Sequence, residues 1–137
     1  MTVQPYLFFD GKCEEALNFY KQALGAQVDM LMRFHEMPDP PPGAIPPGAE
    51  NRVMHAAFRV GDTQIMASDG QCGGKPSFQG FALSINAKDD AEAGKLFTAV
   101  GKGGQVQMPL GKTFFASKFG VVIDRFGVTW MVIAGAN

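Results

Sequence analysis

The side chains of this sequence that could bind a metal or move a proton are His35 with Glu36, His55 and Asp69. Imidazole titrates near neutral pH and can serve as a general base, and imidazole and carboxylate groups together bind divalent metals. His55 is the candidate catalytic residue, with a histidine that packs in the core as the alternative. A metal site would need several of these groups to converge, which their spacing along the chain does not show.

Two cysteines, Cys13 and Cys72, offer a different chemistry. They form neither a CxxC pair nor a zinc-type spacing. Cys13 stands at the expected start of a helix, where the helix dipole could lower the pKa of the thiol and make it reactive. The alternative is a small residue that stands at a helix end for no chemical reason.

The composition indicates a soluble globular protein of 137 residues, 46% hydrophobic and 18% charged, long enough for one domain with a real core. A net charge of −1 argues against nucleic-acid binding, which requires a basic surface. No apolar run approaches the roughly 20 residues that span a bilayer. The N-terminus MTVQPYLFF lacks the pattern of a signal peptide. We therefore expect a cytoplasmic protein that binds neither membrane nor nucleic acid.

Hydrophobic periodicity predicts the elements that must position these groups. In the first half, strands are expected at 4–9, 27–35, 51–59 and 63–69, with a helix between the first two. Acidic residues stand in the first turn of that helix and Gly25 ends it. In the strand at 27–35, the side chains expected on one side are Val28, Met30, Met32 and Phe34.

The second half repeats this order. Strands are expected at 81–85, 105–108, 113–116 with 119–123, and 128–134, and a second helix runs from Asp89 to Gly101. GAQV (25–28) is echoed by GGQV (103–106), and RVGDT (59–63) by RFGVT (125–129). These echoes predict a duplicated strand–helix–strand–strand–strand unit. We expect a single domain over 1–137, made of modules at about 1–70 and 79–137 that a linker at about 70–79 joins.

The segment 37–50, MPDPPPGAIPPGAE, holds six of the nine prolines and cannot form a helix or a central strand. It is expected to be an extended surface excursion. Its role is a lid, an arm that contacts a second copy, or a connection that only spans a gap.

Three stretches resemble the vicinal-oxygen-chelate superfamily, which includes glyoxalase and bleomycin-resistance proteins: PYLFFDGKCEEALNFYKQALGA (5–26), HAAFRVGDTQIMASD (55–69) and TFFASKFGVVIDRFGVTWMV (113–132). The likeness is greatest to the PhnB-like branch and covers nearly the whole chain. It implies an α+β fold of two βαβββ modules, each a curved mixed sheet with a helix on the outer face. It also implies a homodimer.

In the metal enzymes of this superfamily, four strand positions hold a divalent ion inside the cup that the sheets form. The resemblance places Pro5, Ile65, Gly80 and Met131 at these positions, and none of them offers an oxygen or imidazole side-chain donor. We therefore expect no metal and no other cofactor. The alternative is a rearranged site built from the four side chains named first.

The hairpin DRFGV is expected to have a three-residue loop with Gly127 in the left-handed bulge position and Asp124 shaping the turn. Trp130 then points beneath a helix, on the side opposite Met131. If the first hairpin follows the repeat, Ile65 lies opposite His55, whereas a two-residue loop would put His55 under a helix. The expected cup has apolar walls of Leu7, Phe9, Ile65, Phe119 and Met131, with Phe115 beside them, and His55, Thr129 and Ser84 as polar groups.

An apolar cup with few polar groups is typical of small-molecule sites, although Met and Phe at this spacing also form ordinary cores. The sequence predicts a metal-free protein that binds a small apolar or aromatic molecule. The alternative is a lyase, isomerase or dioxygenase of the same superfamily with a non-standard metal site. A ubiquinone-related methyltransferase label attached to PhnB-like proteins is not supported as chemistry, because the turn FDGKCEE (9–15) lacks a glycine-rich cofactor loop.

Overall fold

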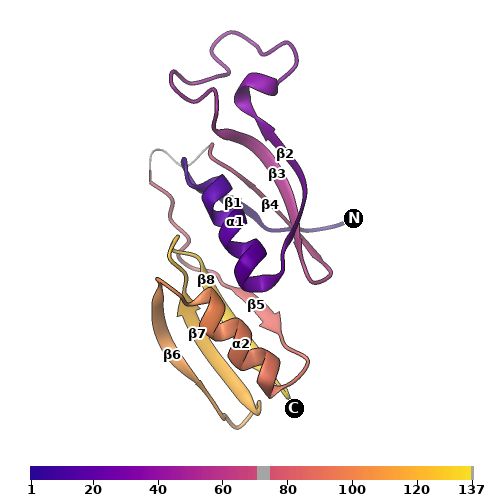
Figure 1. The fold of residues 1–137 in the computed structure, drawn as a ribbon, viewed down its shortest axis with the longest axis vertical. Helices are drawn as coiled ribbons and strands as arrows, with labels where there is room; N and C mark the ends of the chain where they lie inside the picture. The colour runs from indigo at the N-terminus through magenta and orange to yellow at the C-terminus, as the bar shows by residue number, and fades with distance from the viewer. Residues whose placement is uncertain (71–74, 137) are drawn as a thin grey trace. The chain divides into compact units, whose positions relative to one another are not determined.

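The computed structural model describes residues 1–70 and 75–136, and the chain divides into two compact units, Met1–Pro76 and Ser77–Asn137. Figure 1 labels the strands and the two long helices of these units. Unit 1 contains β1 (Tyr6–Phe8), α1 (Cys13–Leu24), β2 (Gln27–Arg33), the short 3-10 helix η1 (Phe34–Glu36), β3 (Val53–Val60) and β4 (Thr63–Ser68). Unit 2 contains β5 (Leu83–Asn86), α2 (Asp90–Val100), β6 (Gln105–Gly111), β7 (Lys118–Ile123) and β8 (Thr129–Ala134).

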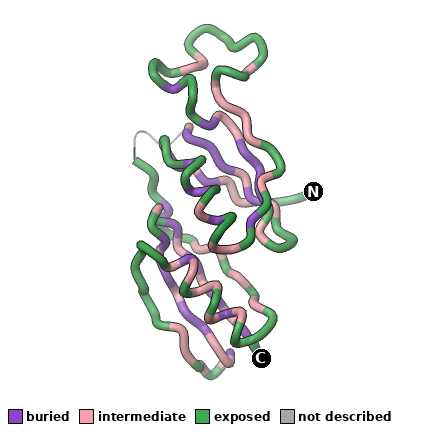
Figure 2. Tube along the Cα trace, viewed as in Figure 1, coloured by how far each residue is buried: buried purple, intermediate pink, exposed green. Residues whose placement is uncertain are grey.

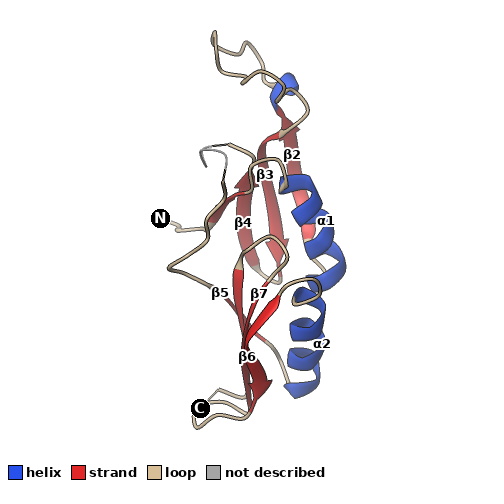
Figure 3. Ribbon diagram, turned by 90° about the vertical axis from the view of Figure 1, so that its left-hand side faces the viewer, coloured by secondary structure: helices blue, strands red, loops and turns tan. Residues whose placement is uncertain are grey.

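Each unit is a four-stranded mixed sheet with one long helix. The strand orders are β1-β4-β3-β2 and β5-β8-β7-β6. The pairs β1/β4 and β5/β8 are parallel, and the other neighbours are antiparallel. Figure 3 shows α1 and α2 each lying against one face of the sheet of its own unit. The expected α+β fold of two βαβββ modules is confirmed.

The face of the unit 1 sheet that packs against α1 is identified by aromatic contacts. The ring of Tyr20, on α1, stacks on that of Phe58, on β3, with centroids 5.9 Å apart and planes 16° apart. The ring of Phe9 lies 6.5 Å from that of Tyr20. All three residues are almost completely buried, and Figure 2 shows the buried stretches concentrated in the strands and along one side of the helix.

In unit 2, Ala93 of α2 packs with Val132 and Ala134 of β8, and Phe97 joins this cluster. Gly120 makes the close approach possible, because a Cβ at this position would lie 2.8 Å from the ring of Phe97. We call the sheet face that contacts the helix the helix-bearing face, and the opposite face, in each unit, the helix-free face.

Several boundaries differ from the predicted ones, and β1, β3 and β5 each start two residues later than expected. The strand expected to reach His35 ends at Arg33. The stretch 113–116, predicted as a strand, is a turn in which the Thr113 N–H donates to the Ala116 carbonyl at 3.0 Å. β6 continues to Gly111 through Pro109, which is tolerated because β6 is the edge strand of its sheet.

The proline-rich segment 37–50 joins η1 to β3 as a loop that extends beyond the sheet (Figure 1). Most of its residues are exposed, and turns close where Ala44 N–H donates to the Pro41 carbonyl and Ala49 N–H to the Pro46 carbonyl. The expected surface excursion is confirmed, and its role stays a prediction. The expected linker at 70–79 includes positions 71–74, which lie outside the described residues, as does Cys72. No helix in the described ranges is both long and apolar enough to cross a membrane.

Candidate functional site

The second hairpin has the geometry that its sequence predicts. Asp124 N–H donates to the Val128 carbonyl at 2.8 Å, and Gly127, with φ of 94°, closes the three-residue loop. Asp124 shapes the turn, because its Oδ1 accepts hydrogen bonds from the N–H groups of Phe126 and Val128. Its Oδ2 accepts a hydrogen bond of 2.8 Å from the indole N–H of Trp130. Trp130 is buried on the helix-bearing face, as expected.

The first hairpin does not follow the repeat. Val60 pairs with Thr63, which leaves a two-residue loop of Gly61 and Asp62, with φ of 58° at Gly61. Ile65 therefore lies opposite Phe58 rather than opposite His55. Because side chains alternate along a strand, this one-residue shift moves the side chains that were expected on the cup side of β4 to the other face of the sheet.

Three predicted cup residues are consequently in the wrong place. Ile65 and Leu7 lie on the helix-bearing face of unit 1 with Phe58, and Phe9 contacts Tyr20 of α1. Each is at most 3% exposed. Their assignment to the cup side is wrong, because the two-residue loop turns them into the core under α1. A two-residue loop was expected to put His55 under the helix. The structure instead places His55 on the helix-free face.

The helix-free face of unit 1 is built around His55 and Tyr6. The Tyr6 hydroxyl lies 2.9 Å from Nδ1 of His55, and the two rings are 5.6 Å apart. Phe8 lies beside them, with its ring 4.9 Å from that of Tyr6. Met32 stands opposite His55 on β2, and Met66 is the parallel partner of Tyr6 on β4. The face is thus aromatic and methionine-rich around one polar pair.

A single-residue bulge occurs at the same place in both sheets. In β2 the register skips Asp29 between Val28 and Met30, and in β6 it skips Gln107 between Val106 and Met108. Each bulge brings a methionine onto the helix-free face, where Met30 pairs with Ala57 and Met108 with Val121. The expectation that Val28 and Met30 share a side is wrong for this reason. Of the eight methionines of the chain, five stand on helix-free faces by their register: Met30, Met32, Met66, Met108 and Met131.

Unit 2 places the remaining predicted residues on its helix-free face. Met131 pairs with Val121 and with Ser84, and Thr129 pairs with Ile123. Phe119 lies two positions before Val121, and the ring of Phe115 meets it edge-on at 5.0 Å. Their shared face is as expected, and ligand binding by them remains a prediction. Sequence reasoning missed Tyr6, Phe8 and Met66, which a two-residue loop at Gly61-Asp62 would have indicated.

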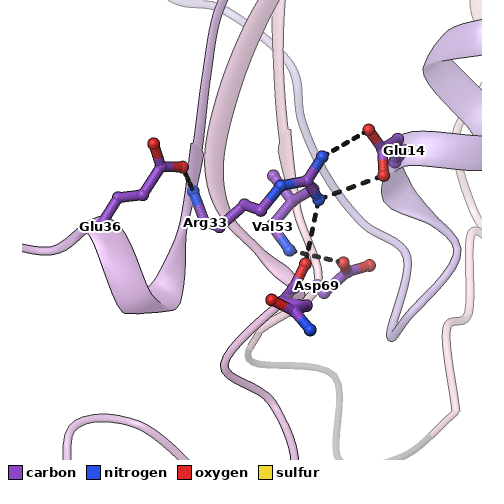
Figure 4. Close-up of polar contacts among 6 residues, drawn as sticks. Glu14, Arg33, Glu36, Val53 and Asp69 are labelled. Carbon is purple, nitrogen blue, oxygen red and sulfur yellow. Dashed lines mark hydrogen bonds and ion pairs between the residues drawn. The ribbon is translucent and has the colours of Figure 1, made fainter.

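Asp69 serves the fold rather than a metal. Its Oδ1 accepts hydrogen bonds from the N–H groups of Gly11 at 2.6 Å and Cys13 at 2.9 Å, and its Oδ2 accepts one from Val53 N–H at 2.9 Å. Asp69 is 7% exposed, and its carboxylate fixes the start of α1 to β3. Figure 4 shows Asp69 at Val53, close to the ion pair of Arg33 with Glu14.

The other conceivable ligands do not gather around Asp69. Glu36 accepts a hydrogen bond of 2.8 Å from Arg33 N–H, and His35 is exposed in η1. Across residues 1–70 and 75–136, no three His, Cys, Asp or Glu side chains lie close enough to hold a metal ion. On the helix-free face of unit 1 the parallel strand pair presents a phenol and a thioether at Tyr6 and Met66, and on that of unit 2 a hydroxyl and a thioether at Ser84 and Met131. Neither pair offers the carboxylate or imidazole donors that divalent ions prefer.

Cys13 is fully buried at the start of α1. Burial raises the pKa of its thiol far above the ordinary value, and the negative charges of Asp69 and Glu14 raise it further. The helix dipole therefore does not activate this thiol, and the alternative of a small structural residue holds.

The family model described as 3-demethylubiquinone-9 3-methyltransferase matches residues 1–133. The chain belongs to this family. Protein YjdN of Escherichia coli is 34% identical over 138 residues, which cover 96% of this chain and 94% of YjdN. Among solved structures, protein PA1353 of Pseudomonas aeruginosa is 39% identical, with a TM-score of 0.86 over 100% of this chain and 99% of that one. The PhnB protein of Bacillus cereus is 27% identical, with a TM-score of 0.79 over 98% and 99% of the two chains.

These matches show the vicinal-oxygen-chelate fold in its PhnB-like branch, as the resemblance implied. A glyoxalase-related enzyme from Fulvimarina pelagi, 15% identical with a TM-score of 0.63, shares the fold alone. The methyltransferase description of the family would require a loop that binds a cofactor. The FDGKCEE turn offers no such loop, because Asp69 already accepts hydrogen bonds from the N–H groups of Gly11 and Cys13. Those groups are the ones that a phosphate or carboxylate of a cofactor would need.

Proposed function

We propose that the protein binds a small, flat, largely apolar molecule without a metal, on the helix-free faces of its sheets. The observation that carries the proposal is the composition of these faces, which gather five of the eight methionines and several aromatic rings around few polar groups. Apolar walls with a few placed polar groups are typical of small-molecule sites, and methionine adapts to irregular ligands.

Naphthalene is a suitable probe, because it is flat, apolar and free of hydrogen-bonding groups. Protein labelled with carbon-13 at the methionine methyls is titrated with naphthalene and followed by NMR. We expect shifts in the methyls of Met30, Met32 and Met66 or of Met108 and Met131, and none in those of Met1 and Met37. Equal shifts in all methyl signals, or none in any, would contradict the proposal.

Two variants separate ligand contact from loss of structure. Met66→Ala removes a side chain of the helix-free face and should weaken naphthalene binding by about 10-fold or more, since one fully buried side chain contributes about 1.5–3 kcal/mol. Its neighbour in sequence, Ile65, faces the helix, so Ile65→Val should lower stability by about 0.5–1.5 kcal/mol and leave binding unchanged. Binding that responds to the Ile65 variant and not to the Met66 variant would place the site elsewhere.

We propose further that the protein acts in the cytoplasm as a homodimer. Met30 and Met108 are 39% and 46% exposed, which is apolar surface that a second copy would cover. Light scattering of the purified protein tests the dimer, and cell fractionation tests the location. A monomer at every concentration would refute the first part, and recovery outside the cytoplasm the second.

A further inference from the structure

The proposed function leaves open which molecules the helix-free face of unit 1 prefers, and the Tyr6–His55 pair bears on this question. Each of the two side chains is half-buried, and they are joined by a contact of 2.9 Å between the phenol oxygen and Nδ1. Aromatic and methionine side chains surround them, with Phe8 beside Tyr6 and Met32 opposite His55. A polar group in such a setting selects ligands by hydrogen bonding more sharply than a solvated one.

The direction of the Tyr6–His55 hydrogen bond follows from acid strength. A phenol, with an ordinary pKa near 10, is a much stronger acid than a neutral imidazole N–H, and imidazole nitrogen is the stronger base. The Tyr6 hydroxyl therefore donates to Nδ1 of His55. The ring proton of neutral His55 is then on Nε2, which becomes a hydrogen-bond donor.

The Nε2–H donor has no partner among the described residues. In the part of the chain that the structure describes, the ring of His55 makes one hydrogen bond, to Tyr6, and Nε2 makes none. We propose that Nε2–H of His55 recognises a hydrogen-bond acceptor on the bound molecule. The preferred ligand class is then flat aromatic molecules that carry a ring nitrogen or carbonyl oxygen, with the ring against Tyr6, Phe8 and the methionines.

Isoquinoline and naphthalene form a matched pair that tests this inference, because they have the same shape and differ in one acceptor nitrogen. At slightly alkaline pH, we expect isoquinoline to bind about 2- to 10-fold more tightly, which is the worth of one hydrogen bond. 2-Naphthol, whose phenol oxygen is a weaker acceptor than the ring nitrogen of isoquinoline, should bind less tightly than isoquinoline. Titration calorimetry or methionine-methyl NMR gives the three dissociation constants.

His55→Phe keeps a planar ring in place and removes the donor. This variant should bind isoquinoline and naphthalene equally, because the acceptor nitrogen of isoquinoline no longer meets a donor. Tyr6→Phe should reduce the preference, because nothing then holds the proton of His55 on Nε2. Thermal unfolding of both variants establishes that they are folded.

The inference rests on the proposed function, and the two fail differently. If naphthalene and isoquinoline bind with equal affinity to the natural protein, the inference is overturned while the proposed function stands. If neither binds, the proposed function fails first. A measurement that needs no ligand is the nitrogen-15 spectrum of the His55 ring, which should show the proton on Nε2. A proton on Nδ1 would overturn the inference directly.

Discussion

At the scale of single residues, the carboxylate of Asp69 holds α1 and β3 together. Asp69 was a conceivable metal ligand in sequence, yet both of its oxygens accept backbone hydrogen bonds, from α1 and from β3. Acidic residues that follow a strand look alike in sequence whether they bind a metal or cap a helix. The difference is made by which N–H groups the fold brings within reach.

Asp69→Ala should therefore destabilise the protein. The change leaves the N–H groups of Gly11, Cys13 and Val53 without their acceptor, and an unsatisfied buried donor costs about 1–3 kcal/mol. Partial access of water to the turn reduces the sum, so we expect a loss of about 2–4 kcal/mol in denaturant unfolding. Glu15→Ala, at an exposed carboxylate in the same turn, is the control and should change stability by less than about 0.5 kcal/mol. A similar effect of both changes would refute the role assigned to Asp69.

At the scale of elements, α1 is tied to β2 by an ion pair. Arg33 donates two hydrogen bonds to the Glu14 carboxylate, at 2.7 and 3.1 Å, and a third to the Asn51 carbonyl at 3.0 Å (Figure 4). The hydrogen bonds from Arg33 hold the pKa of Glu14 below its ordinary value. The folded state thus favours ionised Glu14.

The pH dependence of stability follows from the lowered pKa of Glu14. A carboxyl group whose pKa is lower in the folded state stabilises the fold above its unfolded pKa, and this contribution is lost as the pH falls through the folded pKa. Because half of the Glu14 side chain is exposed, the pair is worth about 0.2–1 kcal/mol. Glu14→Gln should lower the unfolding free energy by this amount at pH 7. The difference should disappear as the pH falls below the ordinary glutamate value of about 4.5. A constant difference from pH 7 to pH 3 would show that the ionised pair is not its cause.

The order of elements could be predicted from the sequence, whereas the register of the first hairpin could not. Helices and strands follow from apolar periodicity, which the duplicated chain presents twice. RVGDT and RFGVT share three letters, but Gly61 is the first residue of a two-residue loop and Gly127 the last of a three-residue loop. Aligning the glycines therefore put Ile65 on the face of Met131, and a shift of one residue exchanged the two faces of unit 1.

The positions of the candidate site residues could be predicted only where the register of their strands could be predicted. The places of Phe119, Thr129 and Met131 followed correctly from the loop of the second hairpin. Tyr6 was missed because the family comparison directed attention to Pro5, one residue before it. The two bulges were missed because skipping Asp29 or Gln107 leaves no mark in a hydrophobic pattern, and only pairing with the neighbouring strand reveals it.

At the scale of the whole molecule, the two units repeat the same feature on their helix-free faces. Both units carry a bulge that adds a methionine, and both pair this methionine with an apolar partner. The two copies of the duplicated unit thus still share a bulge that determines the composition of these faces. Thioethers and aromatic rings suit apolar ligands better than hard cations.

The protein should consequently retain no stoichiometric divalent metal. The histidines and carboxylates of the described ranges do not gather in threes, and Asp69 has both oxygens engaged. Elemental analysis of protein purified without chelator should find Mn, Fe, Co, Ni and Zn well below one equivalent. Dialysis against chelator should leave the Tm unchanged, whereas a site filled at 100 times its Kd would add about 2.7 kcal/mol of stability. One equivalent of metal that persists in the natural protein and disappears in His55→Phe would contradict this expectation, and would move the chemistry of the helix-free face from apolar binding to metal catalysis.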